Sequence, residues 1–66
     1  MRIQLNGQAT ECPDGCTVAE LLARLDIPTA GTAVALNEAV VRKAEYSSTI
    51  LAPDDRVEII RAVAGG

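Results

Sequence analysis

Few residues in this chain have side chains that could do chemistry. The sequence has 66 residues, no His, two Cys and a single aromatic residue, Tyr46. Without His, the usual general base at neutral pH is missing. The remaining candidates are the two thiols of Cys12 and Cys16 and a C-terminal pair of glycines, Gly65 and Gly66, whose terminal carboxylate could be activated.

The two cysteines are separated by Pro13-Asp14-Gly15. A closed zinc site needs about four ligands, which two thiolates without His do not supply, so we expect no metal site. The spacing also differs by one residue from the redox C-x-x-C motif. A disulfide across this turn is geometrically possible but would be unusual in a cytoplasmic protein. We therefore interpret Cys12 and Cys16 as small free thiols that flank a turn.

The C-terminal glycines offer an acyl group rather than a catalyst. A free α-carboxylate has a pKa of about 3.5, so it is ionised at neutral pH and is a poor electrophile. ATP could convert the Gly66 carboxylate to an acyl-adenylate, which a persulfide sulfur or an amine can attack. Residues without a Cβ allow close approach to an enzyme and a nucleotide. A frayed chain end is the alternative explanation of the glycines alone.

Composition limits the class of protein. Hydrophobic residues make up 48% of the chain and charged residues 23%, which is a normal globular balance. Six basic and nine acidic side chains give a formal charge of −3, so nucleic acid is not the expected ligand. The sequence has no apolar run long enough to span a membrane, and its first residues lack the apolar stretch that is typical of a signal peptide, so we expect none. We expect a cytoplasmic protein without a bound cofactor.

Periodicity predicts one helix and several strands. Asn6-Gly7 is a strong hairpin signal, and Thr17 with Glu20 forms a capping box at a helix start. The apolar face of that helix consists of Val18, Leu21, Leu22 and Leu25. The expected strands cover residues 1–5, 8–12, 33–36, 40–42 and 57–63, and the expected helix covers residues 17–26.

This element order predicts an α+β fold, in which one helix covers one face of a mixed sheet of four to five strands. That arrangement is the ubiquitin-like β-grasp. We expect a β-grasp domain over residues 1–63, followed by a flexible Gly-Gly tail over residues 64–66. Ile50 and Leu51 are expected to be buried caps over the core.

A partner enzyme must receive this tail if Gly66 is to react. The residues expected to pass into its channel are Arg61, Ala62, Val63, Ala64 and Gly65. Arg61 is also a candidate docking residue. Val41 and Ile60 could form an apolar docking patch on the uncovered face of the sheet. The alternative is that these two residues belong to the core, as most apolar strand residues do.

The sequence resembles the ThiS family, the sulfur carrier proteins of thiamin biosynthesis, along essentially its whole length. The matching segments are Ile3-Gln4-Leu5-Asn6-Gly7, residues 16–22, Val34-Ala35-Leu36-Asn37, Val40-Val41-Arg42 and the final block of residues 55–66. The final block is the most specific of these. The chain departs from the family pattern at Glu38, where many members have Gly, at the turn Pro53-Asp54-Asp55, and at Tyr46, where Trp is frequent.

The resemblance implies a reaction cycle in which this chain is a protein co-substrate and not an enzyme. A ThiF-type adenylating enzyme would use ATP and magnesium to adenylate the Gly66 carboxylate. A persulfide donor, such as a cysteine desulfurase, would supply the sulfur of a thiocarboxylate. Thiazole synthase would then take this sulfur for the thiazole ring.

Three other functions remain open from the sequence. A small subunit of molybdopterin synthase is also a β-grasp sulfur carrier with a Gly-Gly end, although such chains are usually longer. A β-grasp interaction module without terminal chemistry would bind partners through its sheet. An independent enzyme is a more distant alternative, because neither cysteine has a visible base nearby in the sequence.

Overall fold

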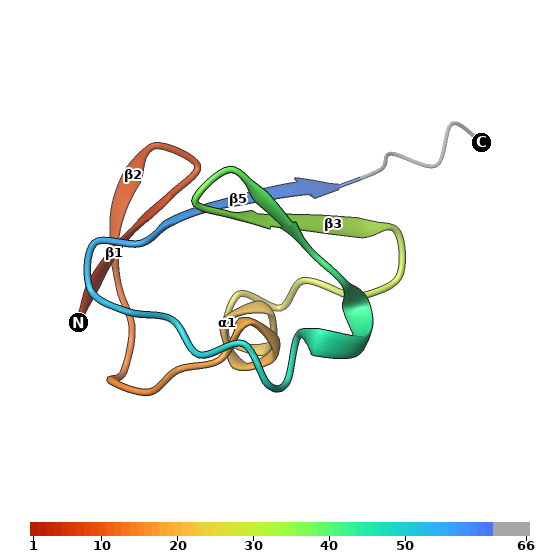
Figure 1. The fold of residues 1–66 in the computed structure, drawn as a ribbon, viewed down its shortest axis with the longest axis horizontal. Coiled ribbons are helices and arrows are strands. Elements are labelled where there is room, and N and C mark those ends of the chain that lie inside the picture. The colour runs from red at the N-terminus through yellow and green to blue at the C-terminus, as the bar shows by residue number, and fades with distance from the viewer. Residues whose placement is uncertain (62–66) are drawn as a thin grey trace.

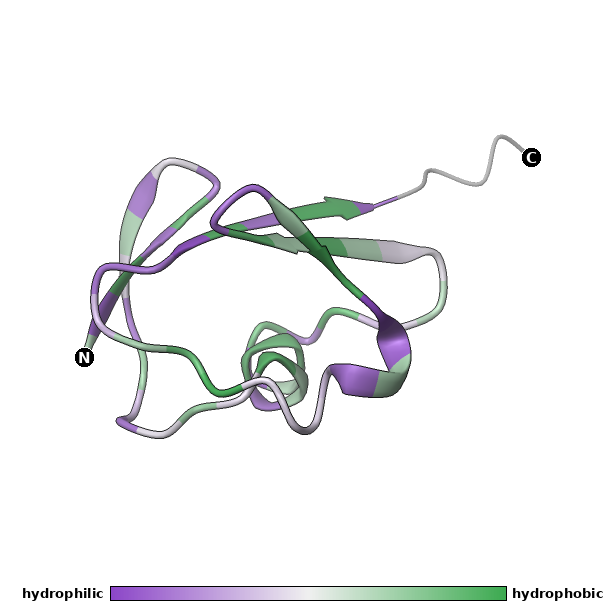
Figure 2. Ribbon diagram, viewed as in Figure 1, coloured by the Kyte–Doolittle hydropathy of each residue, from purple (hydrophilic) through white to green (hydrophobic). Residues whose placement is uncertain are grey.

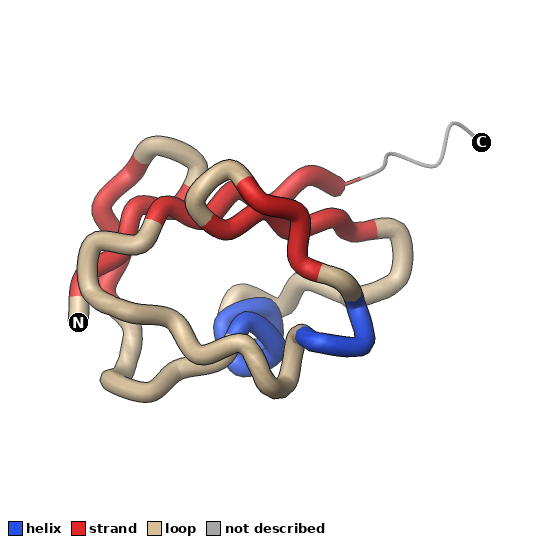
Figure 3. The backbone as a smooth tube through the Cα atoms, in the orientation of Figure 1, coloured by secondary structure: helices blue, strands red, loops and turns tan. Residues whose placement is uncertain are grey.

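The computed structural model describes residues 1–61, with five strands, one α-helix and one turn of 3₁₀ helix (Figure 3). The strands are β1 (Arg2–Leu5), β2 (Gln8–Glu11), β3 (Thr32–Leu36), β4 (Ala39–Val41) and β5 (Arg56–Arg61). The helix α1 is Val18–Arg24, and the 3₁₀ turn is Lys43–Glu45. No helix in this part of the chain has the length and apolar character needed to cross a membrane.

The strands form one mixed sheet in the order β2-β1-β5-β3-β4. β1 and β5 are parallel neighbours, whereas the other pairs of strands are antiparallel. The helix α1 lies below the sheet in Figure 1, within the connection that carries the chain from the β1–β2 hairpin to β3. One helix therefore covers one face of a five-stranded sheet, and the expected ubiquitin-like β-grasp fold is confirmed.

The capping box fixes the start of α1. The Thr17 hydroxyl accepts a hydrogen bond from the Glu20 N–H at 3.1 Å, and a Glu20 carboxylate oxygen accepts one from the Thr17 N–H at 3.1 Å. The helix ends two residues earlier than expected, because Leu25 is the C-cap and Asp26 has a φ of 57°. Leu25 is 36% exposed, so its expected place on the buried face is wrong.

The core lies between α1 and the covered face of the sheet. Its fully buried side chains are Ile3, Val18, Leu21, Val34 and Val57. Figure 2 shows the hydrophobic turns of α1 on the side of the molecule beneath the strands.

The loop after β4 closes the side of this core. Leu51 is buried as expected, whereas Ile50 is 65% exposed, so the prediction that both residues cap the core is wrong for Ile50. Tyr46 is also buried, and its hydroxyl donates to the Thr32 carbonyl at 3.4 Å. This hydroxyl therefore has a partner inside the core.

The two cysteines also belong to the core. Cys12 and Cys16 are 5% and 3% exposed, and both are free thiols, as expected. Burial raises the pKa of the Cys16 thiol, and the neighbouring Cys12 and Glu20 raise it further. A buried, protonated thiol is a poor nucleophile. The geometry therefore gives no support to a catalytic role for this thiol.

Two hairpin turns require left-handed backbone. Asn6 and Gly7 have φ values of 49° and 82°, and Asn37 and Glu38 have values of 50° and 73°. Asn tolerates this region, and Gly adopts it without a steric penalty, whereas Glu carries a cost. Glu38 is therefore strained in the position where the family pattern often has Gly.

Replacing Glu38 with Gly should stabilise the protein by about 0.5–1 kcal/mol, because the relief of strain exceeds the extra entropy of the unfolded chain. The ion pair that is lost, Arg56 to Glu38 at 3.6 Å, is exposed and contributes little. Urea unfolding monitored by circular dichroism measures the change. The variant Glu38→Ala is the control, since it removes the ion pair and keeps the strain, and it should give no gain. Equal stability of the two variants would contradict this explanation.

The burial of Cys16 predicts a dependence of stability on pH. The folded state holds this thiol protonated, whereas the unfolded chain ionises it above its ordinary pKa of about 8.5. The unfolded state then binds fewer protons than the folded state, so the free energy of unfolding should fall from about pH 8 to pH 10. Urea unfolding across this range should show a shallower fall for Cys16→Ala than for the original chain. Parallel curves would show that Cys16 does not contribute.

Candidate functional site

β5 is the element that leads toward the C-terminal glycines. Its described part ends at Arg61, an exposed residue at the end of the strand labelled β5 in Figure 1. The predicted modification site Gly66 lies outside the described residues. The predicted tail and channel residues Gly65, Ala64, Val63 and Ala62 also lie outside them. The site can therefore be analysed through the strand that presents it.

Backbone hydrogen bonds hold β5 in the middle of the sheet. On one edge, Gln4 N donates to the Asp55 carbonyl and Asn6 N donates to the Val57 carbonyl, both at 2.9 Å. On the other edge, β3 pairs with β5 from Val57 to Arg61. β3 thus binds β5 from Val57 to its last described residue, Arg61, whereas β1 binds only the first residues of the strand.

Two asparagine side chains add to this backbone network. The Asn6 carboxamide oxygen accepts from Ile59 N at 2.9 Å, and its nitrogen donates to the Ile59 carbonyl at 3.4 Å. The Asn37 carboxamide oxygen accepts from Arg56 N at 2.8 Å, and its nitrogen donates to Asp55 at 3.0 Å. Sequence reasoning treated both residues only as turn formers. An Asn that opens a hairpin turn next to a predicted strand is the signal that could have indicated these bonds.

The uncovered face of the sheet carries an apolar patch. Ile60 is 61% exposed and Val40 is 79% exposed. Ala33 pairs with Ile60, and Ala35 pairs with Val40, so the two alanines connect these side chains across β3. We call these four residues the outer apolar patch. It lies beside Arg61, next to the strand end that leads to the tail.

Val41 does not belong to the outer apolar patch. It pairs with the buried Val34, and opposed residues in a sheet share a face, so its side chain packs against the core. The expectation that Val41 and Ile60 lie together on the uncovered face is therefore wrong for Val41. The exposed neighbour Val40 occupies that face instead, because successive strand residues point to opposite sides.

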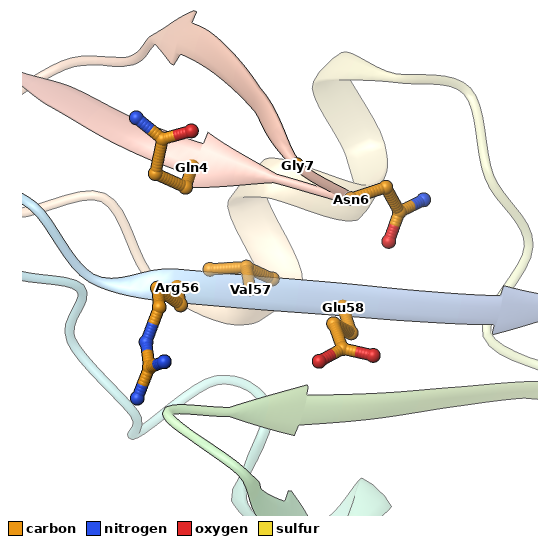
Figure 4. A pocket seen from close by; sticks show the side chains of 6 residues that line it. All are labelled: Gln4, Asn6, Gly7, Arg56, Val57 and Glu58. Carbon is orange, nitrogen blue, oxygen red and sulfur yellow. The ribbon is translucent and has the colours of Figure 1, made fainter.

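A shallow groove lies beside β5 at the end of β1. It has a volume of about 460 Å³, and its lining residues are Gln4, Asn6, Gly7, Arg56, Val57 and Glu58 (Figure 4). Figure 4 shows the Asn6 side chain at the end of β1, beside β5. The groove contains no thiol, hydroxyl or imidazole that could act as a nucleophile. Within residues 1–61, no cluster of three or more potential ligands could hold a metal ion.

Comparison with known proteins gives a consistent result. A model described as the ThiS family matches residues 3–66. The sulfur carrier protein ThiS of Escherichia coli (strain K12) is 38% identical over 66 residues, and the match covers 100% of both chains. A protein of Magnetococcus marinus named thiazole synthase is 35% identical over 66 residues, which cover 100% of this chain and 20% of that protein.

The solved structures agree with the sequence match. The crystal structure of the thiamine biosynthesis protein ThiS from Geobacter metallireducens has a TM-score of 0.85 to this structure, with 28% sequence identity and complete coverage of both chains. An NMR structure of a thiamine biosynthesis protein from the same organism has a TM-score of 0.82 and covers 100% of this chain and 88% of its own. With sequence and fold in agreement along the full length, the chain belongs to the ThiS family of sulfur carrier proteins.

Proposed function

We propose that this chain carries sulfur for thiamin biosynthesis as a thiocarboxylate formed on the Gly66 carboxylate. The observation that carries the proposal is the full-length match to a sulfur carrier, which includes the C-terminal glycines. The arrangement of β5 supports it, because this strand lies between β1 and β3 in the sheet and precedes the C-terminal residues in the chain. The free thiols Cys12 and Cys16 also fit a reducing, cytoplasmic compartment.

The proposed chemistry occurs on the carbonyl carbon of Gly66. A ThiF-type enzyme uses ATP and magnesium, the carboxylate oxygen attacks the α-phosphate, and pyrophosphate leaves. The terminal sulfur of a persulfide, formed by a donor such as a cysteine desulfurase, then attacks the carbonyl, and AMP leaves. The product is an acyl disulfide, in which the Gly66 carbonyl is joined through two sulfur atoms to the donor. A thiol then attacks the donor's own sulfur atom, and the thiocarboxylate leaves. The thiol and the donor are now joined by a disulfide, so the oxidation state of the two sulfurs that reacted is balanced. This chain supplies only the acyl group.

Thiazole synthase is the proposed acceptor of the sulfur. The Magnetococcus marinus protein of that name contains a segment that resembles the whole of this chain. Joining a carrier to its acceptor raises the effective concentration of one for the other, which is a reason to link them in one polypeptide. We propose that this chain meets the same kind of enzyme as a separate protein.

The outer apolar patch is the proposed docking surface. Its exposed side chains, Ile60 and Val40, lie on the face that α1 does not cover, and Ile60 precedes Arg61 at the end of β5. A partner that binds this face would hold the start of the tail next to its own channel. The formal charge of −3 would also speed association with a basic partner surface.

Incubation with a ThiF-type enzyme, ATP, magnesium and a persulfide source should replace one oxygen of the protein by sulfur. Intact-mass spectrometry measures this gain. A chain without Gly65 and Gly66 is the control, and it should remain folded and gain no sulfur. An absence of adenylate and thiocarboxylate with an active enzyme would contradict the proposal for that partner. A truncated chain that retained its partner function would instead support an interaction module.

Replacing Ile60 with Asp should raise the KM of the adenylating enzyme for this chain by about five- to thirtyfold, because burial of one exposed aliphatic side chain contributes about 1–2 kcal/mol. Circular dichroism should show an intact fold, since Ile60 is 61% exposed. Ile59→Asp is the contrasting variant, because Ile59 is buried and its charge should unfold the protein. An unchanged KM for folded Ile60→Asp would exclude this patch as the docking surface.

A further inference from the structure

β5 loses its strand partner on one edge before the tail begins. Leu5 lies opposite Val57, and β1 then ends in the Asn6-Gly7 turn. Strand residues two positions apart present their backbone groups to the same edge. Ile59 and Arg61 therefore face the edge that β1 has left. A strand end bound on one edge only would open more easily than the centre of the sheet.

The Asn6 side chain continues the ladder at this edge. Its carboxamide binds both backbone groups of Ile59, accepting from the N–H at 2.9 Å and donating to the carbonyl at 3.4 Å. A further residue of β1 would offer a similar donor and acceptor. The left-handed φ of 49° at Asn6 turns the main chain away and leaves the side chain beside β5 (Figure 4). Both bonds are partly buried, so water competes with them less than at the surface.

The contact between Asn6 and Ile59 lies near the end of β5 from which the C-terminal residues continue. Gly66 lies seven positions after Ile59 in the sequence. A fully extended chain covers about 3.3–3.6 Å per residue, so the reacting carboxylate can be up to about 25 Å from the Asn6 contact. The end of β5 is the anchor from which this reach is measured, so a shift of the strand end shifts the region that the carboxylate can reach.

We propose that Asn6 is a positioning residue for delivery of the C-terminus. By binding Ile59, it fixes the direction in which β5 presents Gly66 to the adenylating enzyme. The inference rests on the proposed function, since it concerns the delivery of the same carboxylate. Asn6 takes no part in the chemistry itself, and it acts through the backbone of β5.

Asn37 provides a matched control within the same chain. It also begins a hairpin turn, with a φ of 50°, and its carboxamide oxygen accepts from a β5 backbone N–H, that of Arg56, at 2.8 Å. Arg56 is the first residue of β5, at the end away from the tail. Asn37→Gly thus removes a similar side chain from a similar turn without touching the Ile59 contact.

The experiment compares Asn6→Gly, Asn6→Asp and Asn37→Gly with the original chain, at a temperature where circular dichroism shows all four folded. Hydrogen exchange of the Ile59 amide reports the contact without any partner. The rate of pyrophosphate release by a ThiF-type enzyme gives the kcat/KM for adenylation of Gly66. Glycine keeps the left-handed turn at each position, so the comparison isolates the side-chain bonds.

We expect Asn6→Gly to lose protection at Ile59 and to lower kcat/KM about tenfold, through two lost hydrogen bonds. Asn37→Gly should keep Ile59 protected and kcat/KM within about twofold, because its side chain acts at a separate site. Asn6→Asp should lie between them, since it keeps the acceptor for Ile59 N–H and loses the donor.

Three results would overturn the inference. An Ile59 amide that stays protected in Asn6→Gly would show that the contact does not hold the strand. Equal falls in kcat/KM for Asn6→Gly and Asn37→Gly would show a general effect on the fold and no specific positioning. If the original chain is not adenylated by an active enzyme, the proposed function fails and the positioning role fails with it. Ile59 exchange still reports separately whether the contact exists.

Discussion

β1 and β5 lie side by side in parallel, although they are the first and the last strand of the described chain. Parallel neighbours cannot be joined by a tight turn, so the chain must cross from one end of the sheet to the other between them. The helix α1 lies in this crossing and covers one face of the sheet. The position of the core, the choice of the exposed face and the direction of the strand that leads to Gly66 all follow from this pairing.

The two faces of the sheet have different uses as a result. The covered face takes the alternate residues Ile3, Val57 and Ile59 into the core, together with the two thiols, which are thereby kept away from solvent. The open face keeps Ile60 and Val40 exposed. A domain of this size has little interior to spare for a substrate pocket. It is therefore suited to offer a reactive end and a surface for recognition, with the catalytic groups supplied by other proteins.

Local signals in the sequence predicted most of the fold. The capping box at Thr17 and the Asn6-Gly7 turn depend on residues a few positions apart, and the structure confirms both. The errors fall where long-range pairing decides the result. Register with Val34 determines which way Val41 points, and an apolar residue in a short strand does not show its own register. Ile50, in the loop after the 3₁₀ turn, carries no periodic pattern that could assign it to a face.

The chemistry of the candidate site could be predicted from the sequence, but the side-chain bonds that hold β5 in place could not. The residue type and position of Gly66 indicated an acyl group, whereas the bonds of Asn6 and Asn37 to β5 join residues that are far apart in sequence. Each Asn satisfies the left-handed requirement of its turn, which was already a sufficient reason for its presence. The role of each Asn in its turn gave no reason to look for a second role. The bonds to β5 become visible only once the strands are paired.

Because β5 lies in the middle of the sheet, loss of residues from the C-terminal end can also cost the domain its folded state. Exopeptidase trimming that proceeds inward from the C-terminus reaches a strand with neighbours on both sides, and removing it separates β1 and β2 from β3 and β4. A chain damaged as far as β5 would lose its folded state along with the segment that leads to its acyl group. Such a product would not remain folded, so it would not act as a competitive inhibitor that occupies the surface of a partner enzyme. The topology thus makes damaged carriers subject to removal by proteolysis.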